Sequence, residues 1–171
     1  GWPLRAPLFT RSPLGSTSGS TRFDVVVVGA GIAGANVASQ LAERGLSVAV
    51  VDRRRFDSAG AHWHNGVLDR HFVRAGVSPP VAPERSPAVA RFHMFAADGT
   101  PGARIGHPPT VTANMAMLGE RLRHAAAEAG AKVFDESTVA GVDLVADRIS
   151  SIRIESRTGT STSLTAALFV D

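Results

Sequence analysis

The chain has 171 residues, of which 44% are hydrophobic, and it contains no cysteine. The lack of cysteine excludes a disulfide scaffold, a thiolate zinc site, an iron–sulfur cluster and a redox dithiol, so any redox chemistry must come from a bound cofactor. Three arginines within residues 1–22 account for the whole formal charge of +3, and residues 23–171 are neutral. A neutral body argues against a nucleic-acid-binding protein, and no apolar stretch reaches the ~20 residues that a membrane-spanning helix needs.

Residues 1–22 are rich in Ser, Thr, Gly and Pro and show no hydrophobic periodicity. Proline interrupts helices because it lacks a backbone N–H, and the stretch has no apolar core of the kind found in secretory signals. We therefore expect residues 1–22 to form a disordered extension ahead of a folded domain that spans residues 23–171. A transit peptide is the alternative, because the stretch is poor in acidic residues and contains Arg and Ser.

The first regular elements form a strand–helix–strand unit. Residues 23–29 (FDVVVVG) are a β-branched run that predicts a buried strand, and residues 46–52 (LSVAVVD) predict a second one. Between them, apolar residues recur at helical spacing and stop before Gly45, a residue typical of helix C-termini. A strand, a helix and a strand within about 30 residues predict a βαβ unit whose two strands are parallel.

The rest of the chain divides into an irregular part and a regular part. Residues 53–113 contain many prolines, which predicts short helices and strands joined by loops. Residues 115–130 predict a helix, for which Asn114 is a candidate N-cap and Gly130 a candidate C-cap. Five short strands are predicted after this helix, at residues 132–135, 138–145, 149–155, 161–165 and 168–171.

A glycine-rich turn leaves the first predicted strand and opens the helix. Its residues are our candidates for cofactor binding and comprise Gly29, Ala30, Gly31, Ile32, Ala33 and Gly34. The G-x-G-x-x-G spacing suits a dinucleotide because the first glycine allows the tight turn, the second lets a pyrophosphate approach the backbone, and the third allows close packing of helix and strand. The free N–H groups and the dipole of the helix then favour the phosphates.

Asp52 ends the second predicted strand, where a carboxylate accepts hydrogen bonds from ribose hydroxyls. The same carboxylate would repel a 2′-phosphate, which disfavours NADP in this site. Arg53, Arg54 and Arg55 follow and are candidates for contacts with adenine or with pyrophosphate oxygens. A solvated basic edge is the alternative for at least two of them.

Four stretches resemble a known family. Residues 24–54 are similar to the amino-terminal FAD fingerprint of the glutathione-reductase superfamily of flavoproteins. The helix-then-strand segment at residues 111–134, the meander at residues 137–159 and the strand at residues 165–171 (TAALFVD) resemble the p-hydroxybenzoate-hydroxylase-like branch. That branch includes aromatic monooxygenases, flavin-dependent halogenases and geranylgeranyl reductases.

The resemblance implies a Rossmann-like α/β fold with a parallel sheet and an inserted antiparallel β-meander. It implies that Gly29, Gly31, Gly34 and Asp52 bind FAD, and that a backbone group near Val139 meets the adenine. It also implies a cytoplasmic oxidoreductase that acts on an unidentified small molecule, with NAD(P)H as a candidate electron donor. No catalytic residue is assigned, because the flavin carries the electron chemistry.

The sequence departs from the branch in two ways. The branch often has an arginine where Asn114 stands and another between Arg55 and Arg70, where this chain has none. The sequence also stops at Asp171, where the turn that closes the FAD site in the branch would begin. We therefore expect the first part of a longer enzyme, incomplete as a fold and inactive alone, in which residues 54–113 partly belong to a substrate-side insertion.

Three histidines, His62, His64 and His71, lie close together in the sequence. A His-x-His pair in a strand would place both imidazoles on one face, which leaves open a metal site or a group facing flavin or substrate. The spacing matches no zinc site, however, so we expect ordinary surface or packed histidines and no metal.

Two other function classes stay open. An NAD-binding dehydrogenase without flavin would use the same βαβ unit and be colourless, and a non-catalytic dinucleotide-binding module would fold without flavin. A fragment of a longer protein would expose apolar sheet surface and aggregate.

Overall fold

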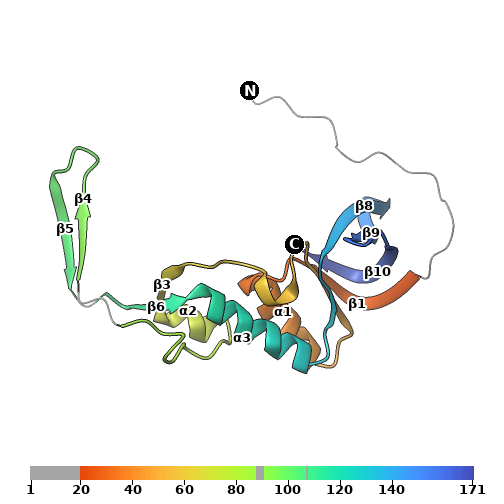
Figure 1. Cartoon of the computed structure of the whole chain (residues 1–171), viewed down its shortest axis with the longest axis horizontal. Coiled ribbons are helices and arrows are strands. Elements are labelled where there is room, and N and C mark those ends of the chain that lie inside the picture. Colours follow the sequence, from red (N-terminus) through yellow and green to blue (C-terminus); the bar gives the residue numbers. More distant parts are fainter. Residues whose placement is uncertain (1–19, 88–90, 107) are drawn as a thin grey trace. The chain divides into compact units, whose positions relative to one another are not determined.

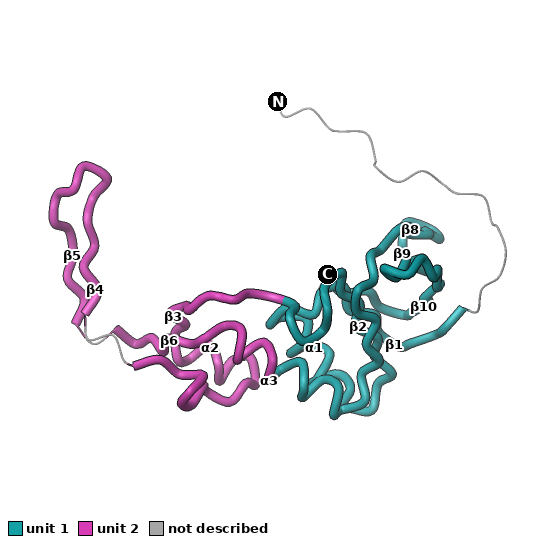
Figure 2. The backbone as a smooth tube through the Cα atoms, viewed as in Figure 1, with its two compact units in different colours: residues 1–59, 122–171 teal, residues 60–121 magenta. Residues whose placement is uncertain are grey.

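The computed structural model describes residues 20–87, 91–106 and 108–171. These residues form two compact units, drawn in different colours in Figure 2. The first unit runs to Ala59 and resumes at Leu122–Asp171, and the second is Gly60–Arg121. No helix in the described part of the chain is long and apolar enough to cross a membrane.

Four parallel strands of a six-stranded sheet form the centre of the first unit, and Figure 1 labels two of them, β1 and β10. Its order is β7 (Lys132–Phe134), β2 (Val48–Val51), β1 (Ser20–Val28) and β10 (Ser161–Val170). β1 pairs in parallel with both β2 and β10, and β2 pairs in parallel with β7. The predicted parallel βαβ unit is therefore confirmed, and its valine runs are continuous because both faces of the sheet are covered.

Helices cover one face of this sheet. They are α1 (Ile32–Glu43) and α3 (Met115–Glu128). Val25, Val27, Val48 and Val50 pack there against small helix residues such as Ala38. Since alanine adds only a methyl group, the α1 backbone lies close to the sheet. Gly45, with φ of +82°, follows α1 as predicted.

An antiparallel meander covers the opposite face. It consists of β8 (Ser137–Val145), β9 (Arg148–Ser156) and the first half of β10. Val26, Ala49 and Val51, whose side chains alternate with those of the helix-facing valines, pack here with Ile152 and Ile154. The first unit is thus a three-layer α/β structure with the meander that the family resemblance implied.

Two strand boundaries differ from the sequence prediction. β10 is one strand over Ser161–Val170, not two, because it pairs with β1 from residue 163 to residue 170 while residues 161–165 pair with β9. β1 begins at Ser20 instead of Phe23, since residues 20–22 pair with residues 163–165 of β10. The rest of the predicted extension, residues 1–19, lies outside the described residues.

The second unit contains the predicted short elements. β3 (His64–Leu68) and β6 (Thr110–Asn114) form an antiparallel pair, α2 (Asp69–Arg74) follows β3, and β4 (Arg91–Phe95) pairs with β5 (Pro101–Gly106). The unit coincides only in part with the predicted insertion at residues 54–113, because the short 3₁₀ helix Phe56–Ser58 belongs to the first unit. A substrate-side role for these elements stays a prediction.

A partly buried ion pair connects the loops of the second unit to α3. Arg121 donates from Nε to Glu84 Oε2 at 2.8 Å and from Nη2 to Glu84 Oε1 at 2.9 Å. Nη2 also donates to the Ser78 carbonyl at 3.0 Å. The hydrogen bond to Glu84 raises the pKa of Arg121.

At the start of α3, the Asn114 side chain accepts hydrogen bonds from two backbone N–H groups, so it is the predicted N-cap.

Glu84→Gln is expected to lower the free energy of unfolding by about 2 kcal/mol. Breaking a fully buried ion pair costs roughly 3–5 kcal/mol, but the Arg121 side chain is 37% exposed and regains hydration. Urea denaturation followed by circular dichroism measures the effect. Arg55→Met is the control, because the Arg55–Asp57 pair is largely exposed and its loss should leave the transition unchanged. Equal midpoints for Glu84→Gln and wild type would show that the pair does not hold the unit together.

Gly34→Ala tests the contact between α1 and the turn that precedes it. A Cβ at Gly34 would lie 1.9 Å from the Gly29 carbonyl oxygen, so backbone must shift. We expect a loss of about 1–3 kcal/mol in unfolding free energy, as for other overpacked sites. Ala33→Ser, at an exposed position one residue earlier, is the matched control and should change stability little. Thermal melts of both variants that overlay the wild-type curve would contradict the close packing.

Candidate functional site

The turn between β1 and α1 requires glycine at its first position. Gly29 has φ of +102°, a conformation that L side chains rarely adopt, and its N–H donates to the Val51 carbonyl at 2.7 Å. Gly31 is the N-cap of α1 and supplies no side chain to cap the helix. The predicted tight turn is therefore present, and it runs directly from a buried strand into a helix.

Gly34 brings the helix onto this turn. Its missing Cβ would meet the Gly29 carbonyl group and lie 3.2 Å from Val27 Cγ1. The close approach predicted for the third glycine is thus observed, although the nearest atom belongs to the turn and not to the strand.

The first turn of α1 leaves backbone donors available. The first helical hydrogen bond runs from the Ala35 N–H to the Gly31 carbonyl at 2.8 Å. The N–H groups of Ile32, Ala33 and Gly34 precede that bond, as the first donors of any α-helix do. Together with the helix dipole they favour an anionic group beside the turn.

The Asp52 carboxylate points at the glycine turn. Oδ2 accepts a hydrogen bond from the Ala30 N–H at 2.7 Å, and Oδ1 accepts one from the Arg54 N–H at 2.8 Å. Ala30 is fully buried whereas Asp52 is half-buried, so the carboxylate lies at the edge of the protein interior. A carboxylate has about four acceptor positions, and the two that remain suit the two hydroxyls of a ribose.

The three residues after Asp52 are arginines on the protein surface. Arg53, Arg54 and Arg55 are exposed, and Arg55 forms an ion pair with Asp57 at 2.8 Å. Hydrogen bonding to the Asp57 carboxylate raises the pKa of Arg55. Arg55 is thus engaged by protein, while contacts of Arg53 with a cofactor stay a prediction.

The start of β8 also reaches Asp52. The Ser137 N–H donates to the Asp52 carbonyl at 2.9 Å, and the Asp52 N–H donates to the Phe134 carbonyl at 3.0 Å. Val139 lies two residues further on, half-buried against the meander core and paired with Ile154. The structure therefore brings the neighbourhood of Val139 to the carboxyl end of β2, and its contact with adenine stays a prediction.

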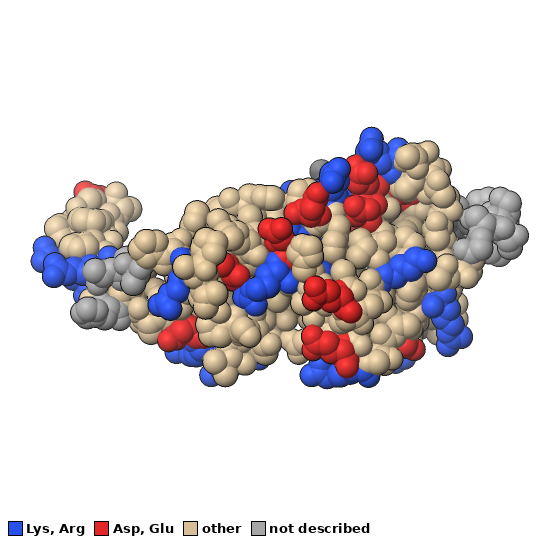
Figure 3. Space-filling model, turned by 60° about the horizontal axis from the view of Figure 1, so that its bottom comes forward, with Lys and Arg blue, Asp and Glu red and all other residues tan. Residues whose placement is uncertain are grey.

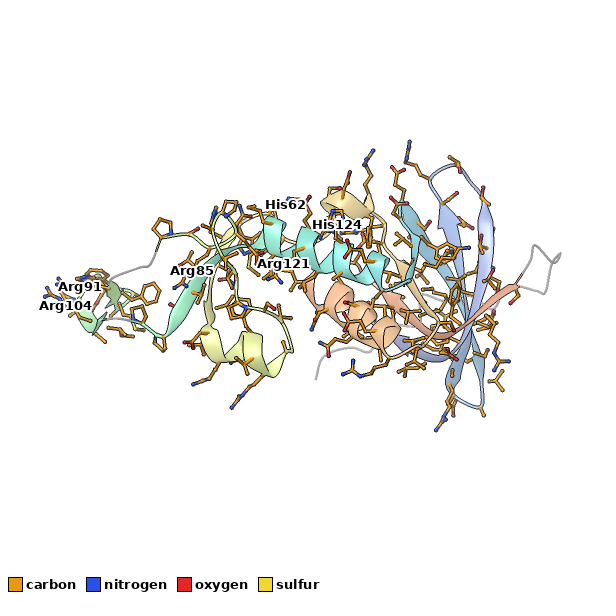
Figure 4. All side chains as sticks on the ribbon, turned by 90° about the horizontal axis from the view of Figure 1, so that it is seen from below. His62, Arg85, Arg91, Arg104, Arg121 and His124 are labelled. Atoms are coloured by element: carbon orange, nitrogen blue, oxygen red, sulfur yellow. The ribbon has the colours of Figure 1, made fainter. Side chains whose placement is uncertain are left out.

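The three clustered histidines, His62, His64 and His71, do not share a strand face. His64 begins β3 and His71 lies in α2, but His62 precedes β3, so the geometry of a His-x-His strand is absent (Figure 4 labels His62). All three are exposed. Within the described residues, no group of three or more His, Cys, Asp or Glu is placed to hold a metal ion.

Two features of this region were not predicted from the sequence. The hydrogen bond from Ala30 to Asp52 joins residues 22 apart, and the buried Arg123 donates to carbonyls more than 60 residues away. Arg123 directly follows Leu122 on α3. A charged residue next to the apolar stripe of a helix was the sequence signal that could have indicated a buried arginine. Basic and acidic side chains are interspersed over the face drawn in Figure 3.

Residues 24–96 match the family model of the FAD-dependent oxidoreductases. A digeranylgeranylglycerophospholipid reductase of Methanothermobacter thermautotrophicus is 33% identical over 135 residues, which cover 71% of this chain and 34% of that protein.

Solved structures share the fold. A geranylgeranyl bacteriochlorophyll reductase-like protein of Thermoplasma acidophilum matches with a TM-score of 0.67 at 20% identity, over 88% of this chain and 39% of that one. The flavin-dependent monooxygenase PieE, solved with FAD and substrate, matches with a TM-score of 0.67 at 21% identity, over 87% and 30%. A myxobacterial chondrochloren halogenase matches with a TM-score of 0.64 at 20% identity, over 88% and 37%.

The chain thus spans about a third of the length of these relatives. The match at residues 24–96 includes the whole β1–α1–β2 unit and its glycine turn. The Rossmann-like FAD-binding fold agrees with that match. The chain is thus similar to the FAD-dependent oxidoreductases over the part that carries the glycine turn.

Proposed function

We propose that this chain forms the ADP-binding part of the FAD site of a flavin-dependent oxidoreductase. One observation carries the proposal above the others. The Asp52 carboxylate is held against the glycine turn by the Ala30 N–H and keeps acceptor positions for ribose hydroxyls. Gly29 and Gly34 set the backbone, and the N–H groups at the start of α1 would face the diphosphate.

FAD supplies the electron transfer chemistry when it is bound. The residues of this chain bind and orient its adenosine end, and none is assigned a catalytic role. Asp52 also sets specificity, because its charge repels a 2′-phosphate and so disfavours NADP in the same position.

The meander supports a flavin site over an NAD-only dehydrogenase. A doubly wound nicotinamide domain continues with alternating strands and helices, whereas β8, β9 and β10 follow β7 here without an intervening helix. The solved neighbours with this arrangement include an FAD complex.

Reduction of double bonds in an isoprenoid lipid is our first candidate reaction. It is supported by the 33% identity to the archaeal lipid reductase, compared with 20–21% to the solved monooxygenase and halogenase cited above. Hydroxylation and halogenation are the alternatives. NAD(P)H as electron donor and a cytoplasmic location belong to this proposal as well.

Asp52→Ala is expected to weaken binding of ADP by about 1–3 kcal/mol, since charge-assisted hydrogen bonds to the ribose are lost. Isothermal titration of the full-length apoprotein with ADP measures the change. Glu128→Ala, at an exposed position near the end of α3, is the control and should bind as wild type does. Unchanged affinity in a folded Asp52→Ala variant would remove Asp52 from the site.

The visible absorption spectrum of the purified full-length protein tests the cofactor itself. We expect a yellow protein that releases free FAD when it is denatured. A colourless protein that binds NAD would contradict the proposal and favour the dehydrogenase. A folded protein that binds neither nucleotide would favour the non-catalytic module.

A further inference from the structure

Arg123 is the one basic side chain that is buried in the described part of the chain. It lies on α3 with 3% of its surface exposed. Its Nη1 donates to the Ala59 carbonyl at 2.6 Å, and its Nη2 donates to the Asp57 carbonyl at 3.0 Å. Burying a guanidinium is costly unless its donors find acceptors, so these carbonyl contacts are a substantial and specific constraint on the backbone of residues 57–59.

These carbonyls belong to the stretch of residues 53–59 that follows Asp52, which we call the arginine segment. Its first part is tied to Asp52 itself, because the Arg54 N–H donates to Asp52 Oδ1. The Arg54 carbonyl accepts from the Glu136 N–H at 3.0 Å, and the Phe56 N–H donates to Asp135 Oδ2 at 3.2 Å. The far end is held by Arg123 and by the burial of Ala59.

We propose that Arg123 is a positioning residue for the nucleotide site and acts through the arginine segment. This inference rests on the proposed ADP site. The segment donates one of the two hydrogen bonds that orient the Asp52 carboxylate, and it carries Arg53 beside that carboxylate. A planar guanidinium can bridge two carbonyls at once. Fixing the far end of the segment therefore fixes the direction of the carboxylate relative to the Ala30 N–H.

Trypsin provides a readout of the segment that does not depend on the cofactor. Arg53, Arg54 and Arg55 are exposed and are cleavage sites. In Arg123→Met, two carbonyls lose their donors and the far end of the segment is released. Cleavage after residues 53–55 of the full-length protein is measured by mass spectrometry. We expect it to become about tenfold faster in Arg123→Met, since hydrogen bonds from a charged group keep the segment folded against the protein in the wild type.

The second readout is the affinity for ADP at a temperature well below the unfolding transition. We expect Arg123→Met to weaken binding about tenfold and Arg123→Lys to give an intermediate value, because an ammonium keeps the charge but not the planar fork. Arg121→Met is the matched control. It lies on the same helix and loses contacts to Glu84 and to the Ser78 carbonyl, but none of them touches the arginine segment.

Each result has a separate meaning. A purely structural role for Arg123 predicts that Arg121→Met and Arg123→Met both lower the melting temperature, while neither differs from the other in ADP affinity or in cleavage rate. That result would overturn the inference. If Arg123→Met fails to fold, Arg123→Lys with wild-type cleavage and affinity would overturn it equally. A wild-type protein that does not bind ADP would instead contradict the proposed function, while the cleavage rates would still show whether Arg123 holds the segment.

Discussion

The hydrogen bond from the Ala30 N–H to the Asp52 carboxylate is the contact on which the proposed nucleotide site depends. It ties the turn after β1 to the end of β2. Asp52 also bonds through its backbone to the Phe134 and Ser137 backbones, so one residue joins the glycine turn, the edge strand β7 and the start of the meander. A carboxylate held in this way needs little rearrangement to accept ribose hydroxyls, and such preorganisation favours binding.

The sizes of the side chains between the central sheet and α1 explain why the glycine turn lies close to the end of β2. Successive valines of β1 and β2 face opposite layers, and alanines on α1 let that helix lie near the sheet. Gly34 continues this close approach up to the turn. The amide end of α1 therefore lies next to the carboxyl end of β2, which is where open α/β sheets bind their ligands.

The fold of this chain is shared by proteins that are named for different reactions. The relatives of this chain include a lipid reductase, a monooxygenase and a halogenase. Their shared fold positions the cofactor, whereas the reaction depends on groups near the flavin ring.

Local patterns in the sequence determined the βαβ unit, the glycine turn, the N-cap at Asn114 and the carboxylate at position 52, because strand runs, helical spacing and cap residues act over a few neighbours. Tertiary structure alone decided the contacts between distant residues. Glu84 and Arg121 are 37 residues apart, and Arg123 and Ala59 are 64 apart. The unbroken β10 likewise depends on pairing with β1, which continues past the end of the β9 pairing and overrides the weak strand preference of Ala166 and Ala167. Side chains that bind across such distances leave no periodic pattern, so only the folded chain shows which of them meet.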